Sequence, residues 1–351
     1  MSKFFVFCPG NIITGGPDAL HQMVYYMNKH DIEAEIVYCD INDGDFEIPK
    51  QYQIYLNRAF TCNTAPITEN DYIIVTETLI RYTEHFNPKG VIVWWLSVDN
   101  NLNKTSLPHR LFFMITLPIR YFFQQNIYKN NFSNIVKYRW LNRRFTFKNE
   151  SFIAFHICAS YYALDYVKQR SKRPVYKCIE PISLLFLQNY KKMLADNIFS
   201  NIEKEDIIIY NPVKSGVFVD KLKKYDKKHT YIKLEKLSQE ELINYYQKAK
   251  IYIDFGPFPG AERMPKEAVL YNCCILTGKN GASAYYGDVP IKDEYKFADY
   301  NNQIDEIISK IDELLQNYES KIRDFDDYKN TVLRLEENFE NSLEEIFKKF
   351  K

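Results

Sequence analysis

Short runs of hydrophobic residues alternate with helical or loop segments along the first half of the chain. Four such runs are predicted to be buried strands, at residues 4–7, 34–38, 72–75 and 91–96. After the first run, residues 18–29 predict a helix, because Leu20, Val24 and Met27 recur on one helical face. This alternation is typical of a parallel sheet covered by helices on both faces. The first half of the chain is therefore predicted to be α/β.

The same alternation returns in the second half, after a further strand predicted at residues 152–157. Predicted strands lie at residues 206–210, 231–234, 251–255 and 274–277. A helix within this series is predicted to begin at Ser238, which has the spacing of a capping box with Glu241. Since 351 residues exceed one ordinary core, we expect two α/β domains with a cleft between them. Their predicted bounds are 1–178 and 179–325, followed by a C-terminal helix at 326–351.

Composition and charge are those of an ordinary globular protein. Apolar residues make up 46% and charged residues 26%, and the formal net charge of +1 gives no overall attraction to nucleic acid. Seven cysteines without C-x-x-C spacing argue against a disulfide framework and a zinc site, and fit a reducing cytoplasm. The N-terminus does not resemble a signal peptide, and no stretch reaches the roughly 18 to 20 apolar residues of a membrane span. We expect a cytoplasmic protein that does not cross a bilayer.

The most informative segment runs from residue 252 to residue 268. It leads from a short strand through a loop rich in glycine and proline into a helix predicted to begin at Pro265. Arg263 and Glu267 lie beside the helix entrance, where backbone amides also attract anions. Such an entrance suits a diphosphate that carries a sugar. The alternative is a structural turn, which would use the same glycines and prolines but has little use for the two charged residues.

In the order of its parts the chain resembles the GT-B glycosyltransferases, particularly the large retaining group that includes bacterial mannosyl- and glucosyltransferases. The resemblance is carried by Gly15 and Gly16 before the first helix, and by residues 211–216, 238–255 and 263–268. It implies two Rossmann-like domains that face a central cleft. In that family the C-terminal domain holds a nucleotide sugar and the acceptor approaches from the N-terminal domain. The nucleotide sugar is the donor substrate, and no further cofactor is expected.

Glycosyl transfer leaves negative charge on the departing diphosphate, so cations are expected to converge on the phosphates. Lys214, in the loop after a predicted strand, and Arg263 are the leading phosphate ligands, with a solvated surface cation as the alternative for each. Glu267 matches the glutamate that contacts the ribose in the family, although a carboxylate there also stabilises a helix terminus. Gly281 and Ser283 lie in a small-residue loop that either approaches the donor through its amides or forms a plain turn.

One glutamate of the family's motif is missing. The family carries it eight positions before the ribose-binding glutamate, and that position is Pro259 here. Glu262 is the candidate that replaces it, from a different place on the loop. In the first half, Asp99 ends a strand-like run at residues 94–98. A carboxylate there is placed to accept a hydroxyl proton or to hold an acceptor sugar, and the alternative is that it caps the next turn.

Three further residues are candidates for the cleft side of the first domain. Gly15 and Gly16 resemble the family's glycine loop, where backbone comes close to donor or acceptor. His156 is predicted to end a strand, where it either hydrogen-bonds a sugar or phosphate or is a satisfied core residue. No group of aspartate, histidine or cysteine residues has metal-ligand spacing, so we expect metal-independent transfer in which lysine, arginine and helix dipoles replace a metal.

Residues 101–149 form a basic aromatic segment. They contain nine Lys or Arg and no Asp or Glu, an excess of +9. Phe112, Phe113 and Arg120 fit an interfacial anchor in which phenylalanines enter lipid and cations meet anionic headgroups. A buried helix with a basic outer face is the alternative. Nucleic acid is a weaker alternative, because the donor-site loops would then have no purpose.

Together these features predict a glycosyltransferase, peripheral on the inner face of the cell membrane, that moves a sugar from a nucleotide sugar to a glycan or lipid-linked acceptor. The expected process is surface polysaccharide or lipopolysaccharide synthesis. A nucleotide-sugar epimerase on the same fold is an alternative, which the basic segment disfavours. A non-catalytic protein that binds sugar nucleotides is another, suggested by the missing glutamate.

Overall fold

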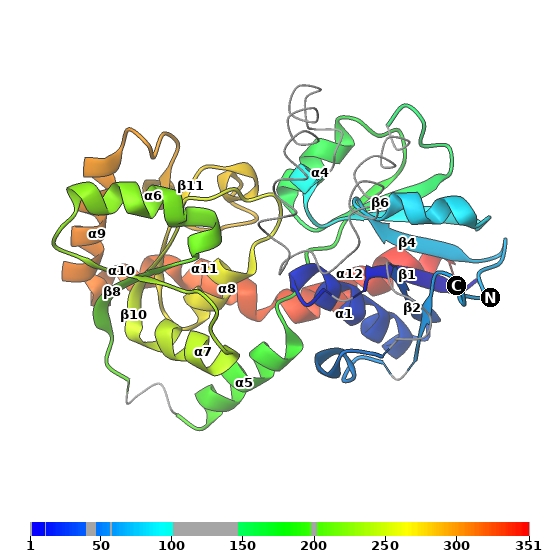
Figure 1. Ribbon diagram of the computed structural model, residues 1–351, viewed down its shortest axis with the longest axis horizontal. Helices are drawn as coiled ribbons and strands as arrows, with labels where there is room; N and C mark the ends of the chain where they lie inside the picture. The colour runs from blue at the N-terminus through cyan, green and yellow to red at the C-terminus, as the bar shows by residue number, and fades with distance from the viewer. Residues whose placement is uncertain are drawn as a thin grey trace, which may run out of the picture. The chain divides into compact units, whose positions relative to one another are not determined.

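The computed structural model describes residues 2–10, 12–39, 47–56, 58–100, 147–197 and 202–350. The chain divides into two compact units (Figure 1). The first unit comprises residues 1–159, 163–178 and 340–351, and the second comprises residues 160–162 and 179–339. Each unit is built on its own parallel sheet, so the two α/β domains predicted from the sequence are confirmed.

The first unit contains a seven-stranded parallel sheet in the order β3-β2-β1-β4-β5-β6-β7. The strands are β1 (Phe4–Pro9), β2 (Ala34–Cys39), β3 (Ala59–Thr61), β4 (Tyr72–Thr76), β5 (Gly90–Trp95), β6 (Ile153–Cys158) and β7 (Val175–Lys177). The order reverses between β1 and β4, because the chain first builds outward to β3 and then continues on the other side. Helices α1 (Gly15–Lys29) and α4 (Tyr161–Lys168) lie on opposite faces of this sheet (Figure 1).

The second unit contains a five-stranded parallel sheet in the order β12-β11-β10-β8-β9. The strands are β8 (Glu205–Tyr210), β9 (Thr230–Lys233), β10 (Ala249–Asp254), β11 (Cys274–Gly278) and β12 (Lys296–Phe297). The helices are α5 (Leu184–Ala195), α6 (Pro212–Tyr225), α7 (Gln239–Lys248), α8 (Arg263–Leu270), α9 (Ile304–Gln316), α10 (Tyr318–Lys321) and α11 (Asp326–Leu333). Here the order reverses between β8 and β10. Open α/β sheets bind ligands at the carboxyl ends of the strands beside such a reversal.

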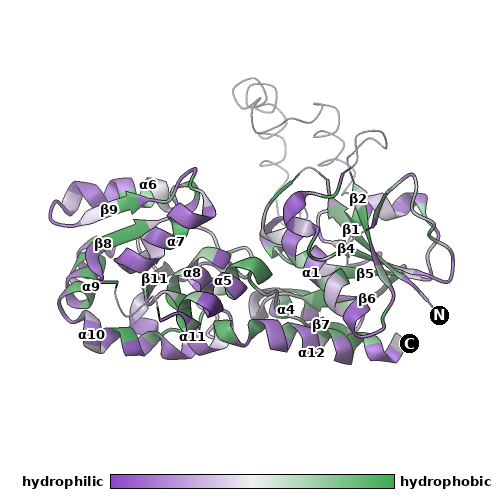
Figure 2. Ribbon diagram, turned by 90° about the horizontal axis from the view of Figure 1, so that it is seen from below, coloured by the Kyte–Doolittle hydropathy of each residue, from purple (hydrophilic) through white to green (hydrophobic). Residues whose placement is uncertain are grey.

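The hydrophobic runs form the interior of both sheets. Strands are hydrophobic along most of their length, whereas the helices carry hydrophilic residues on one side (Figure 2). Trp94 and Trp95 are completely buried in the first unit, and Tyr246, Tyr252 and Tyr271 are buried in the second. Burial on both faces explains why the strands read as continuous hydrophobic runs and not as alternating ones.

The capping box predicted for α7 is confirmed. The backbone N–H of Glu241 donates to Ser238 Oγ over 3.2 Å, and the Ser238 N–H donates to Glu241 Oε2 over 2.7 Å. Two backbone donors at the helix N-terminus are thereby satisfied by side chains of the same turn. Local sequence was sufficient to place this helix.

Two predicted helix starts were wrong. Helix α1 begins at Gly15, so Gly15 and Gly16 belong to its first turn and not to a preceding loop. Helix α8 begins at Arg263, with Glu262 as its N-cap, and Pro265 is the third helical residue. Proline is tolerated there because the first N–H groups of a helix have no intrahelical acceptor, so it does not mark the first position.

The C-terminal residues 326–351 form more than one helix. Helix α11 ends at Leu333, and α12 (Leu335–Phe347) follows as a separate helix. Residues 335–339 belong to the second unit, and the rest of α12 belongs to the first. In the first unit Phe347 packs edge-on against Phe4, with ring centroids 5.0 Å apart. The end of the chain is thus part of the core formed by its beginning.

Candidate functional site

The candidate site lies at the carboxyl ends of β8 and β10, the two strands beside the reversal in the second sheet. Lys214 is in the first turn of α6, which follows β8, and Glu262 is the N-cap residue of α8, which follows β10. Their side chains form an ion pair although the residues are distant in sequence. Both side chains are about one fifth exposed, at 22% for Lys214 and 20% for Glu262, so solvent reaches the pair.

The buried carboxylate of Asp254 links the start of α6 to the loop after β10. Asp254, the last residue of β10, is 1% exposed. Its Oδ1 accepts from Ser215 Oγ over 3.0 Å and from the Gly256 N–H over 3.1 Å. Burial raises the pKa of Asp254 to about 6, while the Lys214 ammonium and the Gly256 amide oppose that shift. Asp254 thus ties helix α6 to the loop that leads to Glu262.

Close backbone approach explains Gly256. A Cβ at this position would lie 2.6 Å from the Cβ of Lys214 and 2.8 Å from its carbonyl oxygen. Only glycine therefore fits where the loop after β10 passes the first turn of α6. The contact fixes Lys214 next to the loop that carries Phe258, and the Lys214 ammonium is 5.8 Å from the centroid of the Phe258 ring.

Helix α8 carries charged residues into the interior. Arg263 is its first residue and is partly buried, whereas Lys266 and Glu267 are buried, with exposed fractions of 3% and 9%. Burial lowers the pKa of Lys266, and the negative charge of Glu180 opposes the shift. Glu267 is the fifth helical residue, not a first-turn residue as predicted, and its Oε2 accepts from Tyr246 OH over 3.2 Å. Glu267 therefore lies farther from the N-terminus of α8 than the sequence predicted.

The loop after β11 packs against the loop after β10. Gly281 has φ +55°, and a Cβ there would lie 2.1 Å from the carbonyl oxygen of Phe258. The next amide, of Ala282, donates to that same oxygen over 2.8 Å. Ser283 is completely buried, and its Oγ accepts from the Asn280 N–H over 2.9 Å and donates to the Gly278 carbonyl. The contacts of Ser283 therefore organise a turn, and Gly281 is required by the close approach to Phe258.

In the first unit, the sequence candidates lie near the carboxyl ends of β1 and β5. Gly15 and Gly16 follow β1 at the reversal of the sheet, and a Cβ at Gly16 would make only an ordinary contact of 3.6 Å with Leu96. Asp99 is exposed and lies in the short 3-10 helix at Val98–Asn100, not at the end of β5. Their roles toward a donor or an acceptor stay predictions.

His156 lies inside β6 and not at its end as predicted. It is completely buried, with Nδ1 accepting from the Trp95 indole N–H over 3.1 Å and Nε2 3.4 Å from Glu150 Oε2. Burial lowers the pKa of His156 to about 4, against the opposing effect of Glu150. The structure therefore shows the core residue that the sequence left as an alternative.

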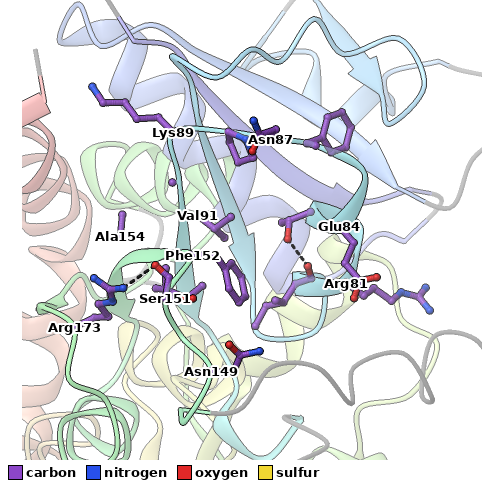
Figure 3. A pocket seen from close by; sticks show the side chains of 16 residues that line it. Arg81, Glu84, Asn87, Lys89, Val91, Asn149, Ser151, Phe152, Ala154 and Arg173 are labelled. Carbon is purple, nitrogen blue, oxygen red and sulfur yellow. Dashed lines mark hydrogen bonds between the residues drawn. The ribbon is translucent and has the colours of Figure 1, made fainter.

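A cavity of about 500 Å³ opens at the amino edge of the first sheet, opposite the carboxyl ends of its strands (Figure 3). It lies where β5 and β6 begin, and it is lined by residues that include Arg81, Lys89 and Phe152. Arg173 is held at its margin by the carbonyl of Ser151, 2.7 Å from Nη2. Because ligands of open α/β sheets bind at the carboxyl edge, the position of this cavity does not favour it as the main site.

The predicted membrane anchor and the predicted metal independence concern different parts of the chain. Phe112, Phe113 and Arg120 lie outside the described residues. Within the described ranges, no helix has the length and hydrophobicity to span a membrane. Among those same residues, no group of three His, Cys, Asp or Glu side chains is arranged to hold a metal ion. Metal independence stays a prediction.

Three residues of the candidate site were not predicted from the sequence. Ser215 and Asp254 support the loops, and Lys266 places a cation in the buried second turn of α8. An aspartate directly after a hydrophobic run was a usable signal for Asp254, because a charged residue at the end of a buried strand needs a partner. No comparable signal marked Ser215 or Lys266.

Comparisons with known proteins define the fold. No protein-family model matches the chain, and no curated protein matches its sequence. Its structure is similar to that of Anabaena HepE in complex with UDP-glucose, with a TM-score of 0.54, 11% identity, and coverage of 100% of this chain and 99% of that one. The structure of a glycosyltransferase of Rickettsia africae is similar with a TM-score of 0.54 and 10% identity, and the match covers 100% of this chain and 98% of that one. WaaG, a glycosyltransferase involved in lipopolysaccharide biosynthesis, is similar with a TM-score of 0.51 and 8% identity, and the match covers 96% of this chain and 98% of that one.

These similarities extend over almost the whole chain and over both sheets. The protein therefore has the GT-B fold, as predicted from the resemblance. Two of these three structural relatives are glycosyltransferases, and the third is in complex with UDP-glucose.

Proposed function

We propose that this protein is a glycosyltransferase that moves a sugar from a nucleotide sugar to a glycan or lipid-linked acceptor. The observation that carries the proposal is the position of Lys214 and the N-terminus of α8 at the reversal of the second sheet. The GT-B fold supports the reaction class. A retaining outcome, a role in surface polysaccharide or lipopolysaccharide synthesis, and transfer of a hexose belong to the same proposal.

The chemistry follows from the charges that develop during transfer. As the bond between the anomeric carbon and the diphosphate oxygen breaks, the sugar gains positive charge and the leaving diphosphate gains negative charge. Lys214, Arg263 and the first amides of α8 would stabilise the diphosphate without a metal ion. Glu267 would accept from ribose hydroxyls, and Glu262 and Asp99 are the candidate carboxylates for the sugar and the acceptor.

We also propose that the protein works at the inner face of the cell membrane. The support is the excess of +9 charges in residues 101–149, interleaved with aromatic residues. Such a segment suits an anionic lipid surface, and a lipid-linked acceptor would be presented there. The proposal does not invoke nucleic acid.

The donor site is tested by Lys214→Ala and Arg263→Ala. Each variant is expected to weaken binding of the donor by about 1–3 kcal/mol, because each removes a charged hydrogen-bond donor from the phosphates. Affinities are measured by calorimetry over a panel of nucleotide sugars. Lys248→Ala is the matched control, since it removes an exposed lysine from the end of α7 in the same unit. Wild-type donor affinity in both site variants would reject this site.

Turnover separates the proposed reaction from its alternatives. Incubation with each nucleotide sugar is followed by measurement of released nucleoside diphosphate. Slow hydrolysis of the donor supports a transferase, because water then replaces the acceptor. Conversion of the donor to its epimer would instead identify an epimerase, and tight binding with no turnover would identify a sugar-nucleotide-binding protein.

A further inference from the structure

The ion pair between Lys214 and Glu262 is part of the candidate donor site. Each side chain is partly exposed, so an anion from solvent can reach the lysine. Lys214 lies in the first turn of the helix after β8 and Glu262 is the N-cap of the helix after β10, and these two strands flank the reversal of the sheet. A phosphate that binds Lys214 must therefore compete with a carboxylate of the protein.

The backbone holds Lys214 in place while its side chain can change partner. Ser215, the next residue, donates to Asp254 Oδ1 over 3.0 Å and accepts from the Phe255 N–H over 2.9 Å. Gly256 lets the loop touch the Cβ and carbonyl of Lys214. These contacts fix the start of α6 against the loop after β10. Exchange of the ion-pair partner is then a movement of side chains, with no displacement of α6.

Glu262 is placed to make such an exchange. It is the N-cap of α8, but its side chain makes no capping hydrogen bond to the amides of that helix. Its carboxylate pairs with Lys214 across the two loops instead. The charge of Glu262 is therefore directed to Lys214 and not to the amides of its own helix.

We propose that Glu262 is an internal substitute for the donor phosphate: a nucleoside diphosphate displaces it from Lys214, and the released carboxylate becomes available to a hydroxyl of the transferred sugar. This inference rests on the proposed function and deepens it. Because Glu262 and the phosphate compete for one cation, the ion pair lowers the affinity for phosphate alone. A donor that also carries the correct sugar recovers that loss through the released carboxylate.

The test is Glu262→Gln, which keeps the shape of the side chain and removes its charge. Binding of the five common nucleoside diphosphates is measured by calorimetry at low salt, with wild-type protein and with the variant. For whichever diphosphate binds, the variant is expected to bind about two- to fivefold more tightly, the range that corresponds to a partly exposed ion pair. Raising the salt concentration should reduce this difference, because salt screens the pair.

Asp206→Asn is the matched control. Asp206 is exposed and pairs with Lys250 over 2.5 Å at the opposite edge of the same sheet, so this variant changes the net charge by the same amount. It is expected to bind as the wild type does. Circular dichroism and thermal unfolding verify that both variants are folded.

The outcomes separate the inference from the function on which it rests. Equal or weaker diphosphate binding by Glu262→Gln, together with measurable binding by the wild type, overturns the inference and leaves the proposed function standing. An equal gain in Asp206→Asn also overturns it, because the effect would then be one of net charge. If neither wild type nor variant binds any nucleoside diphosphate, the proposed function itself fails.

Discussion

Two histidines of the first unit are buried in neutral form. His21 stacks on Tyr52, its Nδ1–H donates to the Pro17 carbonyl over 2.6 Å, and its Nε2 accepts from Tyr38 OH over 2.5 Å. His156 accepts from the Trp95 indole. Burial lowers the pKa of each histidine to about 4. Both are therefore groups that the folded protein resists protonating.

This resistance predicts acid lability of the first unit. In the unfolded chain a histidine takes up its proton near pH 6.5, whereas in the folded unit it does so near pH 4, so stability is lost as pH falls through this window. The loss is roughly 3 kcal/mol for each histidine. Urea unfolding between pH 7 and pH 4 measures it, with fluorescence of the buried Trp94 and Trp95 as the signal.

The variants His21→Gln and His156→Gln isolate each contribution. Both variants lose hydrogen-bond contacts at pH 7. As the pH falls to 4, the free energy of unfolding of each variant is expected to rise by roughly 3 kcal/mol relative to that of the wild type. His85→Gln, at an exposed histidine of the same unit, is the control. A difference between wild type and variant that stays constant with pH would show that these side chains titrate alike in the folded and unfolded states.

At the level of secondary-structure elements, the candidate site depends on loops that touch at glycines. Gly256 passes the first turn of α6, and Gly281 passes the loop after β10. Each contact joins loops that follow different strands. The charged residues at the helix starts keep their positions because these loops cannot move apart independently.

Gly281→Ala tests the second of these contacts. The new Cβ would meet the Phe258 carbonyl oxygen at 2.1 Å, in a backbone conformation with φ +55° that disfavours side chains. We expect a loss of at least about 2 kcal/mol in the stability of the second unit, from overpacking and left-handed strain. Scanning calorimetry is the suitable measurement, because all three tryptophans lie outside residues 179–339.

Gly216→Ala provides a control of opposite sign. Gly216 lies inside α6, and a Cβ there would make only an ordinary contact of 3.8 Å with Pro212. Alanine is expected to stabilise the helix by about 0.5–1 kcal/mol. If Gly281→Ala proved as stable as Gly216→Ala, the close packing of the two loops would be wrong.

At the scale of the whole molecule, the proposed donor site and the basic segment fall in different units. The donor-site residues belong to the second unit, whereas residues 101–149 belong to the first. Such a division of tasks suits an enzyme with a soluble donor and a lipid-linked acceptor.

Membrane attachment is tested by changing Phe112, Phe113 and Arg120 to serine together. Sedimentation with liposomes that contain anionic lipid is expected to fall, because both the apolar and the charged contacts are removed. Neutral liposomes should bind less of the wild type. The control changes Leu194, Val217 and Lys224 to serine, since these are exposed apolar and basic residues of the second unit. Undiminished sedimentation of the first variant would reject the anchor.

Hydrophobic runs and helix signals in the sequence were sufficient for the α/β class and for most of the elements. The central strands are long and buried on both faces, and the start of α7 is encoded by one turn of sequence at Ser238 and Glu241. The short strands β3, β7 and β12 were not predicted, because two or three residues carry too little pattern to identify a strand. The sequence also marked the segments that carry Lys214 and Arg263, because glycine, proline and charge at the end of a strand are local signals. It placed Lys214 in a loop, whereas Lys214 lies in the first turn of α6, and Arg263 is the first residue of α8.

The pairing of the strands decides which of these segments come into contact. Lys214 and Glu262 come together because β8 pairs with β10 while β9 takes the outer side, an order that no local pattern encodes. The same holds for His156, whose place in the core depends on the pairing of β6 with β5. Local hydrogen bonding and side-chain periodicity act within a few residues and can be read along the chain. Ion pairs, burial and shifted pKa values arise between distant segments, and the order of strands in each sheet fixes them.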